Sequence, residues 1–124
     1  MRMPAFLVLV IAALTAGCQH GPDLGLVEGT VTIDGRPLAG ATVVFQPKAG
    51  GHASRGTTDD AGRYQLVYIR DIKGALIGSH TVMIYAASEG DPKERVPARY
   101  NKKSIVTAQV AAGKNEQNFN LTSR

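Results

Sequence analysis

Hydrophobic and polar residues alternate along most of the chain after residue 25, in short runs that end at glycine, proline, asparagine or aspartate. Successive side chains of a strand point to opposite faces of a sheet, so a period of two predicts strands with one buried face. About seven strands are expected. Their inward residues are predicted to be Val27, Val31, Ile33, Ala41, Val43, Phe45, Tyr64, Leu66, His80, Val82, Ile84, Ala86, Val106, Ala108, Val110, Phe119 and Leu121.

Residues with turn chemistry separate these strands. Asp34-Gly35 supplies the positive φ angles of a two-residue hairpin turn. The Asp59 carboxylate can accept hydrogen bonds from N–H groups two residues on, and Gly62 can adopt a left-handed conformation. Gly29, inside the first strand, predicts a bulge or the close approach of another backbone. A looser segment is expected over 68–78, a polar loop over 90–103 and a turn over 113–115.

No stretch of ten residues after residue 18 has convincing helical periodicity, and the chain shows no internal repeat and no second linker. Fourteen glycines and the absence of tryptophan also favour many short elements with many turns over a helical bundle. The predicted fold class is all-β. We expect one domain over 26–124, an antiparallel β-sandwich of about seven strands in two sheets, with almost no helix.

The N-terminus follows a different pattern, with Arg2 and then an apolar run over 5–14 that ends in the sequence LTAGC at Cys18. A basic residue, a short apolar run and small residues are typical of a secretory signal. Ten residues rise only about 15 Å, half of the roughly 30 Å hydrocarbon core, so a permanent span is not expected. Cys18 is the single cysteine and resembles a lipoprotein processing site, although Thr15 occupies the position where leucine is commonest. The alternative is an ordinary signal peptide cut near Ala16.

Residues 1–17 are therefore predicted to be a lipoprotein signal peptide, and Cys18 the lipidated mature N-terminus. Two or more acyl chains would make the anchor stable. Residues 18–25 contain two glycines and a proline, which predicts a short tether with a reach on the order of 15 Å. The expected location is the cell envelope, bound to a membrane through Cys18. Gln19, in place of an aspartate, favours the outer membrane, and nucleic acid is not a partner in that compartment.

Two segments, GTVTIDGRPLAGATV at 29–43 and TDDAGRYQL at 58–66, resemble the carboxypeptidase regulatory-like domain, a transthyretin-like and immunoglobulin-like β-sandwich. That family opens with G-x-V-x-x-x-G-x-P-L-x-G-A-x-V, continues with T-D-x-x-G-x-Y and then has a G-x-x-x-V-x-I strand, matched here at 78–84. The resemblance implies an accessory module without catalysis. Its motif consists largely of turn residues, which specify a fold better than a chemistry: Asp34, Gly35, Pro37, Gly40, Asp59 and Gly62.

No catalytic residue, cofactor or metal site is predicted. The transthyretin fold also includes a hydrolase of a purine-breakdown product that ends in Tyr-Arg-Gly-Ser, but this chain ends in the sequence LTSR. The three histidines, His20, His52 and His80, lack metal-ligand spacing. Asp59 and Asp60 could hold calcium together with Asp34 or Glu28, although an Asx turn explains Asp59 without an ion.

The net charge is +4, from 14 basic and 10 acidic residues, and part of it gathers before the predicted sixth strand. The cations there are Lys93, Arg95, Arg99, Lys102 and Lys103, with Arg70 and Lys73 in an earlier loop. Such a cluster could attract lipid head groups or an anionic glycan. Glu89, Asp91 and Glu94 interrupt it, which favours an ordinary solvated loop.

Tyr85 and Tyr100 could stack on sugar rings. The main hypothesis is a lipid-anchored, non-catalytic envelope protein whose sandwich is a structural or protein-interaction module. The alternative is a module that binds envelope glycan or another polyanion, and a transthyretin-like hydrolase is a weaker one.

Overall fold

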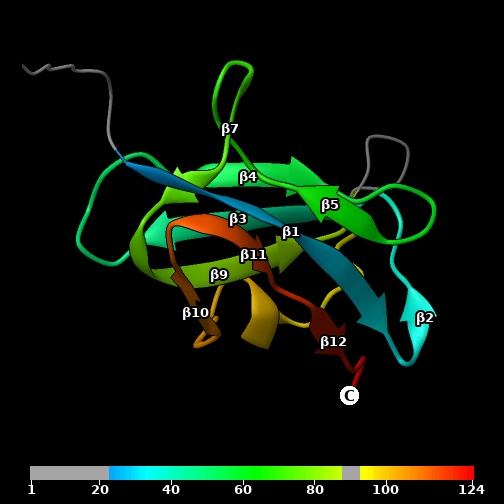
Figure 1. Cartoon of the computed structure of the whole chain (residues 1–124). Coiled ribbons are helices and arrows are strands. Elements are labelled where there is room, and N and C mark those ends of the chain that lie inside the picture. Colours follow the sequence, from blue (N-terminus) through cyan, green and yellow to red (C-terminus); the bar gives the residue numbers. More distant parts are fainter. Residues whose placement is uncertain (1–22, 88–92) are drawn as a thin grey trace, which may run out of the picture.

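The computed structural model describes residues 23–87 and 93–124. Cys18, the predicted signal peptide, Gln19, His20, Glu89 and Asp91 lie outside the described residues. The described chain forms short strands in two sheets that pack on each other (Figure 1). The predicted all-β sandwich is confirmed, although the described residues form twelve short strands where about seven were expected.

The first sheet is built around β1 (Leu24–Ile33). On this strand pair, in antiparallel orientation, β2 (Arg36–Pro37), β5 (Arg63–Gln65) and β8 (Ala75–Leu76). Two further strands, β11 (Gly113–Glu116) and β12 (Phe119–Leu121), run parallel to β1, unlike the antiparallel ladders expected. Leu24 and Gly25 were expected to end the tether, but they form the start of β1. Both residues pair with β8, and Gly25 also pairs with β11.

The second sheet is antiparallel throughout. Its order is β10 (Thr107–Val110), β9 (Gly78–Tyr85), β3 (Thr42–Pro47), β4 (Ser54–Thr57), β6 (Val67–Ile69) and β7 (Ile72–Lys73). The longest ladder joins β3 to β9, from Thr42 opposite Tyr85 to Pro47 opposite His80. These two strands therefore set the length of the sandwich.

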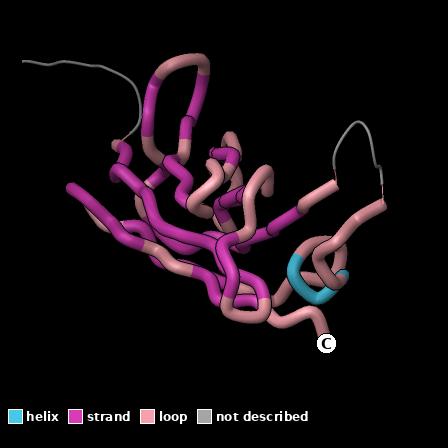
Figure 2. The backbone as a smooth tube through the Cα atoms, turned by 90° about the vertical axis from the view of Figure 1, so that its right-hand side faces the viewer, coloured by secondary structure: helices cyan, strands magenta, loops and turns pink. Residues whose placement is uncertain are grey.

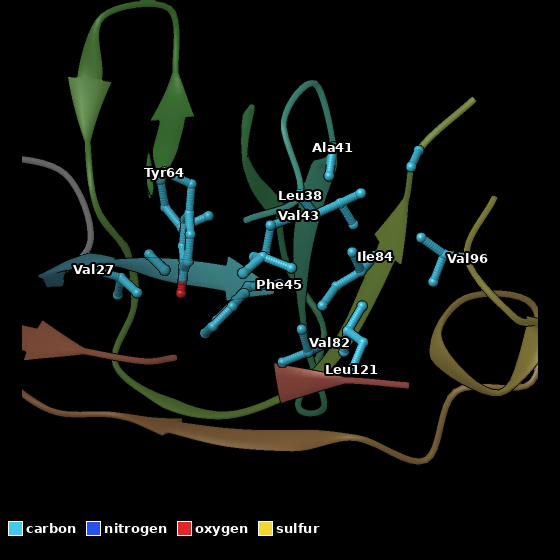
Figure 3. Close-up of a cluster of buried hydrophobic side chains, with 14 of the residues drawn as sticks. Val27, Leu38, Ala41, Val43, Phe45, Tyr64, Val82, Ile84, Val96 and Leu121 are labelled. Atoms are coloured by element: carbon cyan, nitrogen blue, oxygen red, sulfur yellow. The ribbon is translucent and has the colours of Figure 1, made fainter. Parts of the chain in front are cut away.

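The core lies between the sheets (Figure 3), and valine is its commonest residue. Phe45, Leu66 and Ile84 are its largest fully buried apolar side chains. Phe119 packs edge-on against Phe45, with ring centroids 6.1 Å apart, and also contacts Tyr64 at 6.4 Å. Most residues predicted to point inward are buried. Four of them are only partly buried at the margin of the core, namely Ile33, Val106, Ala108 and Phe119.

Several local predictions differ from the structure. The strand expected around Tyr64 and Leu66 is divided, because the chain passes from β5 in the first sheet to β6 in the second at Leu66, whose N–H donates to the Val27 carbonyl at 2.9 Å. The looser segment 68–78 contains the β6–β7 hairpin and β8, and the loop 90–103 contains one turn of 3₁₀ helix, η1 (Ala98–Tyr100). In the described part of the chain, no helix is long and apolar enough to cross a bilayer.

The turn expected at 113–115 is instead part of strand β11. The Asn115 side chain makes the preceding bend, since its carboxamide oxygen accepts from the Ala111 N–H at 3.0 Å and its amide donates to the Ala111 carbonyl at 2.8 Å. The same amide donates to the Leu26 carbonyl at 2.9 Å. A polar parallel strand of this kind has no hydrophobic alternation, so the sequence pattern does not reveal it.

The turn chemistry accounts for the hairpins around the first sheet. Asp34 and Gly35 have φ angles of 53° and 82°, as a two-residue hairpin turn requires. Asp59 Oδ1 accepts from the N–H groups of Ala61 and Arg63, each at 2.9 Å. At Gly29 a Cβ would lie 1.9 Å from the Gln117 carbonyl oxygen, which confirms the predicted close approach.

Candidate functional site

The sandwich has two ends that differ in chemistry. We call the N-terminal end the region where β1 begins, together with β8, the β6–β7 hairpin and the loop 48–53. The C-terminal end contains η1, the turn between β1 and β2, and residues 122–124. Figures 1 and 2 both show the hairpin and the start of β1 on the opposite side of the molecule from η1 and the C-terminus.

Arg99, one of the predicted anion-binding cations, holds the C-terminal segment in place. Its Nη2 donates to the Thr122 carbonyl at 2.8 Å, to the Thr122 hydroxyl at 2.7 Å and to the Arg124 carbonyl. The guanidinium also lies 4.8 Å from the ring centroid of Tyr100, in cation–π contact. This arginine therefore has a structural role.

Arg95 and Glu94 close the loop that follows β9. The Arg95 Nε donates to the Ala86 carbonyl at 3.0 Å, while the Glu94 carboxylate accepts from the N–H groups of Ala86 and Val96. Both side chains thus satisfy the backbone at the end of β9. Glu94, expected only to interrupt a basic cluster, fastens the loop to the sandwich. Lys93 begins the described part of the same loop after the gap.

Lys102 and Lys103 are exposed after η1, on a segment that Asn101 fixes to the core. The buried Asn101 amide donates to the carbonyl groups of Ile84 at 3.0 Å and Val96 at 3.2 Å. Its oxygen accepts from the Lys102 N–H at 2.7 Å. The two lysine side chains project from this anchored turn.

The two earlier cations, Arg70 and Lys73, lie on the β6–β7 hairpin at the N-terminal end. They therefore lie on the opposite side of the molecule from η1 (Figures 1 and 2). The fold does not bring the seven cations together, because β6 and β7 lie at one edge of the second sheet, whereas the loop that carries the other five cations joins β9 to β10 at the opposite edge.

Arg36 joins the basic residues of the C-terminal end, although sequence reasoning assigned it only to the turn motif. Together with Arg95 it lines a shallow hollow of about 630 Å³, which also contains Asp34. The Ser123 hydroxyl and N–H donate to the Asp34 carboxylate and lower its pKa below the usual value of 3.8. The lining of the hollow thus includes two arginines and a carboxylate that is already engaged with the C-terminal segment.

Tyr85 and Tyr100 do not form one stacking surface. Tyr100 packs against the core, and its hydroxyl accepts from the Thr122 N–H at 3.1 Å. Hydrogen bonds with the Thr122 side chain and backbone lower the pKa of Tyr100. Tyr85 instead alternates with the inward Ile84 and faces away from the core.

A shallow groove of about 420 Å³ lies on the outer face of the second sheet, across β3, β4 and β9. It is lined by Thr42, Val44, Gln46, Ala53, Arg55, Met83 and Tyr85. Tyrosine, methionine and arginine are enriched at protein interfaces, whereas lysine, aspartate and glutamate are depleted, and none of these last three lines the groove. The sequence singled out only Tyr85, because the other lining residues mix polar and apolar types and form no recognisable motif.

The described histidines are engaged within the fold. The buried His80 has its Nε2 2.6 Å from the Leu76 carbonyl and its ring 5.4 Å from that of Phe45, while His52 lies edge-on to Tyr68 at 5.2 Å. Over 23–87 and 93–124, no group of three His, Cys, Asp or Glu side chains is placed to hold a metal ion.

No protein-family model and no curated protein matches the sequence. Among solved structures, the chain is similar to a DUF3823 family protein from Parabacteroides merdae, with 12% sequence identity and a TM-score of 0.48. The similarity covers 81% of this chain and 46% of that protein, so the chain spans less than half of its length. This similarity assigns neither a family nor a function.

Proposed function

We propose that the chain is a lipid-anchored protein of the cell envelope, with Cys18 as the lipidated residue and the β-sandwich as a non-catalytic structural or protein-interaction module. The position of the single cysteine carries this proposal. It follows a signal-like segment of 17 residues and precedes β1, which begins at Leu24, by five residues. A short tether of this kind would hold the folded domain at a membrane surface.

The sandwich is further proposed to be a carboxypeptidase regulatory-like domain. Contact between the two motif segments supports this assignment. The buried Thr58, which begins the second motif, donates to the Leu38 carbonyl at 2.6 Å and accepts from the Ala41 N–H at 2.8 Å. The two motifs are thus parts of one buried structural unit, as expected of motifs that specify a fold.

The anchor is tested by intact mass spectrometry of the protein purified from membranes of a lipoprotein-processing host. The expected mature chain begins at Cys18 and carries the mass of a diacylglyceryl group. The Cys18→Ser variant should lack this mass and leave the membrane fraction. A mature chain that begins elsewhere, with the thiol unmodified or removed, contradicts the proposed anchor.

The interaction module is tested with a photoreactive amino acid at Tyr85, inside the groove on the second sheet. The matched control carries the same group at Glu28, on the exposed face of the first sheet. Irradiation of intact cells should yield a discrete cross-linked protein from position 85 and not from position 28. Equal cross-linking at both positions, or none at either, argues against the groove as the binding surface.

The hollow between Arg36 and Arg95 favours a second candidate, a module that binds an anionic envelope glycan. Two guanidinium groups beside one depression can bind carboxylate or phosphate groups in the bidentate mode. Retention on an acidic polysaccharide should then fall with salt and with Arg36→Gln plus Arg95→Gln. The control pair Lys102→Gln and Lys103→Gln removes equal charge outside the hollow. If the control pair weakens retention equally, the hollow is not the site.

A further inference from the structure

The β6–β7 hairpin projects from the N-terminal end of the sandwich, as both Figures 1 and 2 show. Ile69 and Ile72 are cross-strand partners at its tip, and their side chains are 37% and 51% exposed. Arg70 and Asp71 form the two-residue turn between them. Single exposed apolar residues are common on protein surfaces, but here two adjoin at a projecting tip.

The hairpin also carries positive charge. Arg70 and Lys73 are exposed and each follows one of the two isoleucines, and with the exposed Asp71 between them the hairpin keeps a net charge of +1. Lys114 lies on the neighbouring part of β11, which pairs with the start of β1, and Lys48 begins the loop that leads to β4. The tip therefore combines apolar side chains with cations, the composition of surfaces that lie in the head-group region of a bilayer.

The root of the hairpin packs against the point where the chain enters the domain. A Cβ at Gly74 would lie 2.7 Å from the Gly25 carbonyl oxygen and 3.3 Å from the Leu24 Cβ. Six residue steps separate Cys18 from Leu24, and at about 3.5 Å per step they span at most about 20 Å. The hairpin extends from Gly74 by only a few residues, so its tip lies within the reach of such a tether.

We propose that the tip of the β6–β7 hairpin contacts the bilayer surface, with Ile69 and Ile72 among the head groups and Arg70 and Lys73 paired with lipid phosphates. This inference rests on the proposed lipid anchor at Cys18. The acyl chains would supply the attachment, and the hairpin would set the orientation of the sandwich. The C-terminal end, with its arginine-lined hollow, then faces away from the membrane.

The chain contains no tryptophan, so one introduced indole reports on one position. The lipidated mature protein is reconstituted into vesicles of phosphatidylethanolamine and phosphatidylglycerol that carry brominated acyl chains. The Ile72→Trp variant should show blue-shifted emission that the bromines quench. The matched control is Ile105→Trp. Ile105 is 87% exposed and precedes β10, which lies at the opposite edge of the second sheet from the hairpin. Its emission should be neither shifted nor quenched.

The outcomes separate the hairpin contact from the anchor itself. A sample that carries the lipid mass on Cys18 while Ile72→Trp stays unquenched overturns the membrane contact and leaves the anchor intact. A sample without the lipid mass contradicts the anchor. Blue-shifted emission that depends on protein concentration and ignores the bromines indicates a second copy of the chain on the tip, which also overturns the proposal.

The charged residues of the hairpin are tested in the same vesicles. Replacing Arg70 and Lys73 by glutamine in the Ile72→Trp background should reduce the quenching, and the reduction should disappear in vesicles of phosphatidylcholine alone. Replacing Lys102 and Lys103 by glutamine removes the same charge from the C-terminal end and should leave the quenching unchanged. An equal loss with both pairs would show that only net charge matters, and it would contradict a specific role of the hairpin.

Discussion

The two ends of the sandwich are held together by different interactions. At the C-terminal end, side chains of Glu94, Arg95, Arg99 and Asn101 donate to or accept from the backbone of neighbouring segments. At the N-terminal end, strand pairing and close backbone contact hold β1 against its neighbours, and the hairpin side chains project outward. The comparison shows that charged side chains clustered in sequence can be engaged in hydrogen bonds within the fold, while a short hairpin exposes its charged and apolar side chains to solvent.

The largest expected effect comes from breaking the backbone contact of the N-terminal end with Gly25→Ala. A Cβ there would lie 2.1 Å from the Ala111 carbonyl oxygen and 2.9 Å from a Val110 methyl group. Overpacking of this kind should lower the free energy of unfolding by about 3 kcal/mol, measured by urea denaturation. Gly40→Asn, at a position with φ of 71° and open space, is the control and should cost far less. Similar losses in both variants would show that close contact does not distinguish this end.

The buried hydrogen bonds between the two motif segments are tested by Thr58→Val, which keeps the shape of the buried side chain and removes its hydroxyl. The variant leaves the Leu38 carbonyl and the Ala41 N–H without their partner. We expect a loss of about 2 kcal/mol in the free energy of unfolding, since unsatisfied buried polar groups cost that order of energy. The exposed neighbour offers the control Thr57→Val, for which the change should stay within about 0.5 kcal/mol. Equal effects would contradict the role of the Thr58 hydroxyl.

The fold could be predicted from the sequence wherever structure depends on nearest neighbours. Alternation identified the main buried faces, and turn residues such as Asp34, Gly35 and Gly62 mark local conformations that few other residues adopt. Strand β11 was missed because it is polar and pairs with β1 in parallel, and β1 lies almost ninety positions away in the sequence. Long-range pairing of a polar segment leaves no periodic signal.

The candidate site was less predictable than the fold. The sequence shows that Arg95 and Arg99 carry charge, but it does not show that the Arg95 Nε and the Arg99 Nη2 donate to backbone carbonyl groups. Arg36 occupies a variable position of the first motif segment, and only the fold places it in the lining of the same hollow as Arg95. Likewise, Ile69 and Ile72 occur in a segment without clear alternation, so their exposure at a hairpin tip follows from pairing that sequence reasoning left undefined.

A partly buried hydrogen bond within the first sheet, between β5 and the segment that joins β11 to β12, sharpens the comparison through its pH dependence. The Tyr64 hydroxyl donates to the Gln117 carbonyl at 2.6 Å, and burial, with a smaller contribution from the charge of Glu116, raises the pKa of Tyr64 above 10.0. Because the folded state prefers the neutral phenol, this contribution to stability is complete below pH 10.0 and is lost as the pH rises further.

Tyr64→Phe should cost about 1 kcal/mol of unfolding free energy at neutral pH. The difference between the variant and the parent should shrink above pH 10.0, where ionisation of the parent phenol becomes favourable only in the unfolded chain. Urea denaturation of both proteins across this range measures it. A difference that stays constant with pH would show that Tyr64 does not titrate differently in the two states.

The smallest expected effect concerns the exposed hydrogen bonds that hold the C-terminal segment. Arg99→Gln removes those to Thr122 and Arg124. Exposed charged contacts contribute little, so the free energy of unfolding should fall by less than about 1 kcal/mol. Amide hydrogen exchange should nevertheless rise at residues 122–124, because the segment loses its anchor while the sandwich stays folded. Lys103→Gln removes the same charge from a side chain that extends into solvent, and it should leave this exchange unchanged. Equal release of the C-terminal segment by both variants would show that net positive charge holds it. The arginine at this end would then not differ in role from the exposed cations of the hairpin.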